Sequence, residues 1–465
     1  MSRLLSQKRS KASPAGFNMN DIAALLQTDF VQQNDKLDLT RIDFDESKAD
    51  ENCLFLGLVC DLTDSTKYLD QAYDNGCRNF VSQVGLDKPD INLILVPDGV
   101  EALNRIAIEV RAKHRLPIVG VTGSVGKTTT KEMIYSVLAE GFKTLRSIGN
   151  FNTEPAIARR LTNLNQSHQL AVFEVSSKQP GEITRKTRLL RPNLGVITSI
   201  GTAHIANYKN QDGIFAEKIS LAKDFDEANL LVVNGDDEYL QALKSQTKPY
   251  QLVSVGFGQN NDLVCTDYQI IDDSIRFEVL VNGRCERFTI QSRAKHNIVN
   301  AMLAIATGLH FKLKLRQIRS GLEQWQTRKD RANIEKTAKF IVINDCYNAC
   351  SSSMIGALEL LNGYASRKVA VLGDIAEMGR FAEAEHRLVG SHVTADLLVT
   401  IGQDSRYIGD EAVKLGFTEE HWRHFDNKAD FLAVFDSLIV VGDTILVKAS
   451  RVMELEEIVN FILSQ

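Results

Sequence analysis

The sequence predicts an α/β protein of three domains, the central one built on a mainly parallel sheet. Three observations lead to this prediction. The chain has 465 residues, and one domain takes roughly 150 residues. Short apolar runs alternate with amphipathic helical patterns over most of its length, which is typical of parallel strands covered by helices. A glycine-rich segment, 123–129, lies between one such run and one such helix.

Composition excludes several classes of protein. Apolar residues make up 44% and charged residues 24%, so the chain is globular rather than disordered. A net charge of −5 gives no basic excess for nucleic acid. No apolar run approaches the roughly 20 residues that span a membrane. The seven cysteines lack the paired spacing of a zinc site or disulfide scaffold. We therefore expect a soluble, cytoplasmic chain in a reducing compartment.

Residues 1–16 are basic and polar and lack the apolar core of a signal peptide. We expect a disordered tail, with a weak basic contact as the alternative use. Residues 17–115 form the predicted small α/β domain, in which Asn18 or Asn20 caps a helix through Leu26. Its further predicted strands are Leu54–Val59, Asn79–Gln83 and Leu93–Val96, and its further helices Asp70–Asn75 and Val100–Lys113.

Residues 116–330 form the predicted central domain. Asn282-Gly283 between two β-type runs indicates a hairpin turn. The predicted strands are Pro117–Thr122, Leu170–Val175, Leu194–Ser199, Asn229–Asn234, Tyr250–Phe257, Leu263–Ile271, Ile275–Val281 and Arg284–Ile290. The predicted helices are Lys131–Glu140, Ala156–Asn163, Ile214–Ala222 and Asn297–His310.

Residues 331–465 form a third α/β unit. Its predicted strands are Phe340–Asn344, Lys368–Leu372, Leu397–Ile401 and Thr444–Val447, with helices between them.

The segment that follows the strand Pro117–Thr122 reads Gly123-Ser124-Val125-Gly126-Lys127-Thr128-Thr129. Backbone N–H groups of such a loop surround phosphate oxygens, and the following helix adds its positive dipole end. Lys127 would reach the β- and γ-phosphates and the Thr128 hydroxyl Mg²⁺. The longer form of the motif has Gly where this chain has Val121. A glycine turn with an incidental lysine is the alternative, but strand, loop and helix occur in the required order. Kinase, GTPase, motor and ligase all remain open.

Further polar residues follow predicted strands. Glu174 ends one strand, where it could hold Mg²⁺ or be an ordinary surface acid. His204 also follows a strand, although a lone histidine is more often structural. Lys218, taken alone, is predicted to be a solvated surface charge. Residues 234–237 suit a tight turn with a helix cap, and Cys346 a small buried position.

Many further short motifs follow one another along the chain. They are Gly120–Thr129, Asn150-Phe-Asn152, Glu174, Gly181-Glu-Ile183, Thr198–His204, Lys218, Asn234-Gly-Asp-Asp237, His296–Asn300, Arg331, Asp345–Ala349, Ser353-Met354, Leu372-Gly-Asp374, Glu377-Met-Gly379, His386 and Val447–Arg451. On these residues the sequence resembles the Mur ligase family over nearly the whole chain from about Asn18.

The resemblance implies an ATP-dependent, ADP-forming acid–amino-acid ligase. The first domain would bind a nucleotide-sugar donor, the central P-loop ATPase domain ATP, and a Rossmann-like last domain the incoming amine. A carboxylate would take the γ-phosphate to become an acyl phosphate, which the amine attacks. The branch that adds D-Ala-D-Ala to a UDP-muramoyl tripeptide for the cell wall is the most similar. It also implies a monomer with small-molecule substrates only.

The resemblance also implies roles for individual residues. ATP would contact the loop Gly123–Thr129 with Asn297 and Asn300 near adenine, Arg331 at a phosphate and Asp345 at the ribose. Two Mg²⁺ ions would be held by Thr128, Glu174 and His204, and CO₂ would convert Lys218 to a carbamate. Substrates would contact Asp64, Asn150, Asn152, Ser176, Asn348, Lys448, Ser450 and Arg451.

Some stretches depart from the family pattern. Where the family has Asp-Ser-Arg and Asp-Gly-His near its uridine site, this chain has Asp43-Phe44-Asp45 and Asp64-Ser65-Thr66. Glu174-Val-Ser-Ser177 is more similar to the sister ligase that adds the third residue, and Asp330 replaces a usual Gly. Two alternatives therefore stay open: a paralogue that joins another acid and amine, and a non-catalytic nucleotide-binding protein.

Overall fold

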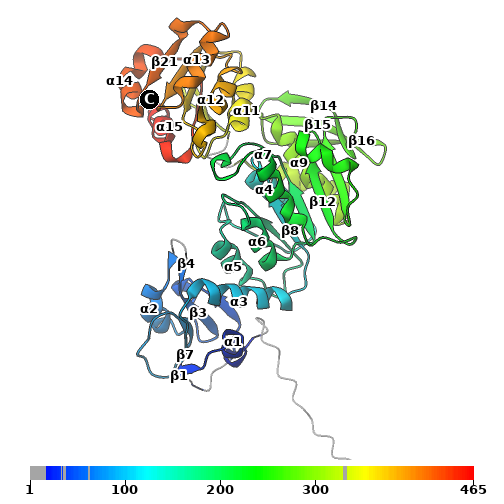
Figure 1. The fold of residues 1–465 in the computed structure, drawn as a ribbon, viewed down its shortest axis with the longest axis vertical. Helices are drawn as coiled ribbons and strands as arrows, with labels where there is room; N and C mark the ends of the chain where they lie inside the picture. Colours follow the sequence, from blue (N-terminus) through cyan, green and yellow to red (C-terminus); the bar gives the residue numbers. More distant parts are fainter. Residues whose placement is uncertain (1–16, 33, 35–37, 61–62, 328–331) are drawn as a thin grey trace, which may run out of the picture. The chain divides into compact units, whose positions relative to one another are not determined.

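A computed structural model describes residues 17–32, 34, 38–60, 63–327 and 332–465 (Figure 1). The predicted tail, 1–16, lies outside them. The chain forms two compact units. One comprises residues up to Val119 with Phe142–Val175 and Arg185–Pro192, and the other Gly120–Gly141, Ser176–Thr184 and Asn193–Gln465. The predicted α/β class is confirmed, whereas the division into three domains stays a prediction. No helix in the described ranges is long and apolar enough to cross a membrane.

A five-stranded sheet in the first unit has the order β1-β7-β6-β3-β2, in which only β1 is antiparallel to its neighbour. The capping box that Asn18 forms with Asp21 starts the first helix, as predicted. The strands are β1 Phe30–Gln32, β2 Arg41–Asp43, β3 Cys53–Gly57, β6 Asn79–Ser82 and β7 Asn92–Leu95, and a small hairpin pairs β4 Val59–Cys60 with β5 Thr63–Asp64. The helices are α1 Met19–Leu26, α2 Leu69–Asp74 and α3 Gly99–Lys113.

A nine-stranded sheet has the order β16-β15-β14-β13-β12-β11-β8-β10-β9. Strands β11 to β14 pair in parallel, and so do β9 and β10, whereas β14, β15 and β16 form an antiparallel meander. The predicted hairpin is present, because Asn282 and Gly283 both have positive φ, at 49° and 77°. The strands are β8 Ile118–Thr122, β9 Thr144–Arg146, β10 Leu170–Glu174, β11 Leu194–Ile197, β12 Leu230–Asn234, β13 Gln251–Gly256, β14 Leu263–Ile271, β15 Ser274–Val281 and β16 Arg284–Ile290.

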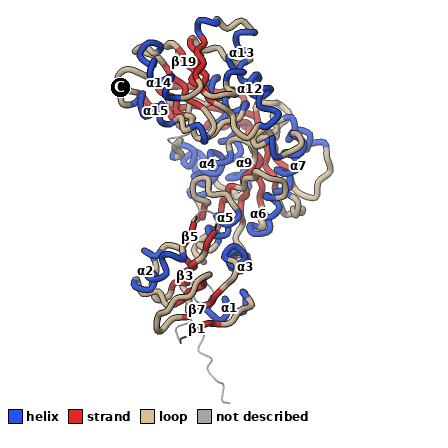
Figure 2. The backbone as a smooth tube through the Cα atoms, turned by 60° about the vertical axis from the view of Figure 1, so that its left-hand side comes forward, coloured by secondary structure: helices blue, strands red, loops and turns tan. Residues whose placement is uncertain are grey.

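The helices of this region are α4 Lys127–Ala139, α5 Glu154–Leu161, α6 Glu182–Leu190, α7 Gln211–Ile219, α8 Glu238–Gln241, α9 His296–His310 and α10 Leu315–Gln324. Helix α4 begins at Lys127, four residues before the predicted start at Lys131. Apolar periodicity marks only the part of a helix that faces a core, so it missed the polar first turn. Helices α4 and α9 lie side by side in both views (Figures 1 and 2).

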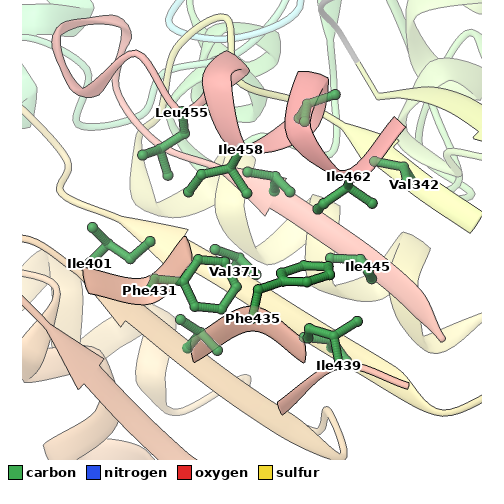
Figure 3. Close-up of a cluster of buried hydrophobic side chains, with 14 of the residues drawn as sticks. Val342, Val371, Ile401, Phe431, Phe435, Ile439, Ile445, Leu455, Ile458 and Ile462 are labelled. Atoms are coloured by element: carbon green, nitrogen blue, oxygen red, sulfur yellow. The ribbon is translucent and has the colours of Figure 1, made fainter. Parts of the chain in front are cut away.

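The last sheet has the order β17-β18-β22-β19-β20-β21, with only β17 antiparallel. Helices α14 and α15 cover one face and α12 and α13 the other (Figure 2), and α11 packs on β22 and β19 beside α12 (Figure 1). Phe431 and Phe435 of α14 pack on Val371 and Ile445 of the sheet beside Ile458 of α15 (Figure 3). The strands are β17 Asn333–Lys336, β18 Ile341–Asn344, β19 Lys368–Gly373, β20 Leu397–Ile401, β21 Trp422–Phe425 and β22 Thr444–Lys448. The helices are α11 Ser351–Asn362, α12 Ala382–Gly390, α13 Arg406–Lys414, α14 Lys428–Leu438 and α15 Glu456–Leu463.

Candidate active site

The glycine-rich loop joins the end of β8 to the start of α4. Gly123 and Gly126 have φ of +139° and +81°, which other residues rarely adopt. A Cβ at Gly123 would also lie 2.0 Å from Thr198 Oγ1. The end of β11 holds the loop, since Ser124 N donates to Ser199 O at 2.8 Å and Thr198 Oγ1 donates to Val125 O. The loop is therefore a fixed turn of backbone N–H groups. Val121, at the position where the longer motif has glycine, lies inside the strand β8. The glycine-rich turn therefore begins only at Gly123.

Lys127 and Thr128 open α4. The Lys127 Nζ donates to the carbonyl oxygens of Gly123 at 2.8 Å and Ser124 at 2.9 Å, so its charge lies over the loop. Thr128 is buried, and Thr129 follows it in the same turn. An ammonium beside a turn of N–H groups at a helix start is the arrangement that binds a polyphosphate.

Asn297 and Asn300, both buried on α9, form a chain of side-chain hydrogen bonds that reaches Thr130 on α4. Asn300 Oδ1 accepts from Thr130 Oγ1 at 3.0 Å, and its Nδ2 donates to Asn297 Oδ1 at 2.9 Å. A Cβ on Gly126 would approach Asn300 Oδ1 to 2.8 Å. Asn300 thus lies against the phosphate loop.

Lys218 is buried on α7, so the surface position predicted for it when taken alone is wrong. Its Nζ donates to Ser177 Oγ at 2.8 Å, and the Tyr208 hydroxyl donates to the same oxygen at 3.1 Å. The neighbouring Glu217 carboxylate accepts from the backbone N–H groups of Gly181 and Ile183, at 2.6 and 2.7 Å. These bonds connect α7 to the segment that starts α6.

His204 has a left-handed backbone, with φ +62°, and its Nδ1 is hydrogen-bonded to the Glu377 carboxylate. Burial and the positive charges of Lys127 and Lys218 lower the pKa of His204, against the raising effect of Glu377. Glu377 also pairs with Lys178 at 3.0 Å. Asp237 caps α8 as predicted and accepts from Ile200 N at 2.7 Å, which fixes the loop before His204.

Residues predicted for the nucleotide and the amine meet at the ends of β18 and β22. The Lys448 Nζ lies 2.6 Å from Asp345 Oδ2 and donates to Asn348 O at 2.9 Å, and its side chain is only 2% exposed. Ser450 Oγ accepts from Ala376 N at 2.8 Å, and Arg451 pairs with Glu456. Arg331 and Asp330 lie outside the described residues.

The remaining predicted residues are spread over other elements. Glu174, at the end of β10, is buried, and its Oε1 accepts from Asn152 Nδ2 at 2.7 Å. Asn150 is exposed, and Ser176 is half-buried just before Ser177. Asp64 is exposed, and hydrogen bonds from the Thr66 hydroxyl and N–H lower its pKa.

Two buried residues at this site, Ser177 and Tyr208, were not predicted. Ser177 ends the stretch Glu174-Val-Ser-Ser177 after β10, whereas Tyr208 follows a short helix, and no sequence pattern connects either residue with Lys218. Cys346 is buried, as interpreted. In the ranges that the structure describes, no three His, Cys, Asp or Glu side chains form a metal-binding group.

Comparison with known proteins adds the family. Residues 121–308 match the Mur ligase middle domain and residues 330–451 the glutamate ligase domain of Mur ligases. A UDP-N-acetylmuramoyl-tripeptide–D-alanyl-D-alanine ligase of Bacillus subtilis is 33% identical over 426 residues, which cover 90% of this chain and 91% of the relative. This chain belongs to the Mur ligase family. The enzyme of the same name from Escherichia coli is 27% identical over 92% of this chain and 94% of its own.

Solved structures of the Mur ligase family have the same fold. A crystal structure of MurF from Acinetobacter baumannii aligns with a TM-score of 0.85 and 27% identity, covering 97% of this chain and 99% of that one. A MurF ligase from Thermotoga maritima, solved in complex with ADP, has a TM-score of 0.77 at 21% identity, covering 91% and 97%. Members of the Mur ligase family are ATP-dependent, ADP-forming ligases, and this chain is therefore an ATP-dependent ligase.

Proposed function

We propose that the chain joins D-alanyl-D-alanine to a UDP-N-acetylmuramoyl tripeptide, with ATP converted to ADP and phosphate. The observation that carries the proposal is the Bacillus subtilis ligase of that activity, 33% identical over 90% of the chain. The reaction first moves the γ-phosphoryl group to the donor carboxylate. A carboxylate is a poor electrophile because it lacks a good leaving group, and phosphorylation supplies one. The amine then attacks the carbonyl carbon and phosphate departs.

The phosphate loop suits the nucleotide. Gly123 lies where any side chain would collide with Thr198, so only glycine allows this tight turn. Glycine-rich turns at a helix start bind phosphate oxygens through backbone N–H groups. Lys127 would exchange its bonds to the loop carbonyls for the β- and γ-phosphates. Asn297 and Asn300 would lie near adenine, while Arg331 and Asp345 would reach a phosphate and the ribose.

Thr128, Glu174 and His204 are proposed to hold Mg²⁺. Mg²⁺ prefers one or two protein oxygen ligands completed by phosphates and water. The buried Glu174 carboxylate, held by Asn152, suits such a ligand. When bound, the ion neutralises charge that develops on the transferring phosphoryl group. To bind Mg²⁺ through Nδ1, His204 would have to break its hydrogen bond to the Glu377 carboxylate.

Lys218 is proposed to carry a carbamate formed with CO₂, whose anionic group would help to position the acyl phosphate. Its burial beside two hydroxyl groups supports this, because a solvated lysine would not be held in one conformation. Asp64, Asn150, Asn152 and Ser176 are proposed for the donor, and Asn348, Lys448, Ser450 and Arg451 for the amine.

A second candidate function is the same reaction on another acid and amine. The specific observation is the pair of altered stretches in the first unit. Asp43 and Asp45 accept hydrogen bonds from nearby backbone N–H groups, and Asp45 also pairs with Lys48 at 2.6 Å. Asp64 accepts from Thr66. Acidic side chains occupied in this way cannot replace the arginine and histidine that the family has near its uridine site.

Phosphate release from ATP tests the two functions. We expect release only when UDP-muramoyl tripeptide and D-Ala-D-Ala are both present, together with an amide product. Turnover with a different acid–amine pair alone would favour the second function, and nucleotide binding without any amide product would favour a non-catalytic protein. Oxygen-18 in the donor carboxylate should appear in the released phosphate. Label that stays wholly in the amide would contradict the acyl-phosphate route.

A further inference from the structure

The amine of Lys218 contacts a buried hydroxyl group, that of Ser177, which a second buried hydroxyl, that of Tyr208, also contacts. Ser177 Oγ lies 2.8 Å from Lys218 Nζ and 3.1 Å from the Tyr208 hydroxyl. Ser177 is 2% exposed, Lys218 3% and Tyr208 7%, so bulk water does not compete for these bonds. The three residues come from three separate segments: the chain after β10, α7, and the residue that follows the short helix Ile205–Asn207.

The direction of the bonds is fixed by the donors available. The Lys218 amine and the Tyr208 phenol both donate to Ser177 Oγ. Burial raises the pKa of Tyr208 to about 12, against a lowering effect of the Ser177 hydrogen bond. The phenol therefore stays protonated at neutral pH and remains a donor. A hydroxyl has two lone pairs and one proton, so Ser177 uses both lone pairs and keeps its proton to donate.

The backbone that carries Ser177 is also held on α7. Glu217, next to Lys218, accepts hydrogen bonds from Gly181 N and Ile183 N at 2.6 and 2.7 Å. Consecutive residues of one helix therefore hold both the segment and the Ser177 side chain. Ser177 is fixed by its backbone and by Tyr208, and so can itself fix a mobile lysine side chain.

We propose that Ser177 is a positioning residue that orients the carbamate on Lys218, and that Tyr208 holds the Ser177 hydroxyl in place. The inference rests on the proposed carbamate. In that reaction the Lys218 ammonium first releases one proton to the buffer, the neutral Nζ bonds to the carbon of CO₂, one C=O electron pair moves onto oxygen, and a second Nζ proton leaves to the buffer. Nζ keeps one hydrogen. Because a carbamate is planar, an N–H directed at Ser177 Oγ sets the plane of the group and the direction of its two oxygens.

A role in packing alone predicts a different result. Removal of a buried hydroxyl that only packs would lower thermal stability and leave the carbamate unchanged. Removal of a positioning hydroxyl would weaken the carbamate, since the modified side chain would lose the bond that holds its N–H. The two roles are therefore separated by measuring the carbamate itself.

The test compares Ser177→Ala and Tyr208→Phe with the wild-type chain. Carbamate is measured by ¹³C NMR in ¹³C-bicarbonate, and ligation is measured at increasing bicarbonate. We expect S177A to raise the half-saturating bicarbonate on the order of tenfold and Y208F about fivefold, with a weaker carbamate signal in both. Ser177→Thr, which keeps the hydroxyl, should restore the signal. Ser245→Ala and Tyr250→Phe, on η5 (Ala242–Ser245) and just before β13, are matched controls that should leave it unchanged.

Two results would overturn the inference and are distinguishable. If the wild-type signal is present and S177A and Y208F retain it in full at the same bicarbonate dependence, the positioning role is wrong and the proposed function stands. If the wild-type chain shows no carbamate in saturating ¹³C-bicarbonate, the carbamate on Lys218 is wrong and the inference fails with it. Thermal unfolding of each variant shows that a lost signal does not come from an unfolded chain.

Discussion

Arg111 of α3 closes the C-terminal end of α6. Its Nε donates to Leu190 O at 2.8 Å and its Nη2 to Arg191 O at 3.2 Å, while Nη1 donates to His114 O at 2.7 Å. The last carbonyl groups of a helix have no partner within the helix. Here a buried guanidinium supplies two donors at the end of α6 and a third to the residue that follows its own helix, α3.

We expect Arg111→Ala to lower the free energy of unfolding by about 3 kcal/mol, because buried carbonyl oxygens would lose charged donors. Arg111→Lys keeps the charge but not the fork of donors, so it should recover only part of the loss. Urea denaturation of the three proteins checks this. Equal stability of R111A and the wild-type chain would contradict the capping role.

Lys127→Ala should abolish ligation, with a loss of at least about a hundredfold in rate, because the charge that stabilises the transferring phosphoryl group is removed. The fold should survive, since the Lys127 Nζ donates to the carbonyl oxygens of Gly123 and Ser124 in its own loop. ATP-dependent phosphate release and the unfolding midpoint are measured together. Retention of wild-type release in K127A would show that this loop does not serve the reaction.

Sequence patterns predicted the helices and strands whose apolar residues recur in a regular pattern. Apolar strands such as β8 and β12 were found because both faces of a buried parallel strand are apolar. The three-residue strands β1, β2 and β9 were missed, since so few residues show no period. Lys218, taken alone, was wrongly predicted to be a solvated surface charge. Its charged neighbours in sequence do not reveal its hydrogen bond to Ser177, which lies 41 positions away along the chain. Contacts of this kind depend on tertiary packing alone.

Asp237→Asn should destabilise the turn after β12 and the loop before His204. The carboxylate accepts from Ile200 N through Oδ2 and from Tyr239 N and Leu240 N through Oδ1. An asparagine keeps one oxygen for the cap but presents an NH₂ group to a second N–H donor. We expect a loss of about 1–3 kcal/mol in the free energy of unfolding, measured by urea denaturation. Asp226→Asn, at an exposed turn, is the control. An equal loss of stability in this variant would contradict the stabilising role of the Asp237 carboxylate.

Lys448, which is buried beside Asp345, has two possible roles that its variants can distinguish. If Lys448 mainly neutralises Asp345, then Lys448→Met should lower the free energy of unfolding by about 3 kcal/mol because a largely buried carboxylate is left without its partner. Asp345→Asn in the same chain should restore part of this stability. If Lys448 instead contacts the amine, K448M should raise the KM for D-Ala-D-Ala with little change in stability. Unfolding and kinetics of the single and double variants decide between these results.

Tyr208 gives a prediction for alkaline pH. Burial raises its folded-state pKa to about 12, above the value of roughly 10 for a phenol in an unfolded chain. A raised pKa means that the protonated phenol stabilises the fold fully below about pH 10, and that this contribution is lost as pH rises towards 12. The stability difference between the wild-type chain and Tyr208→Phe should therefore be constant from pH 7 to 9 and shrink above pH 10. Urea denaturation across this range measures it. A difference that grows above pH 10 would mean that the phenolate, not the phenol, is the form that the fold prefers.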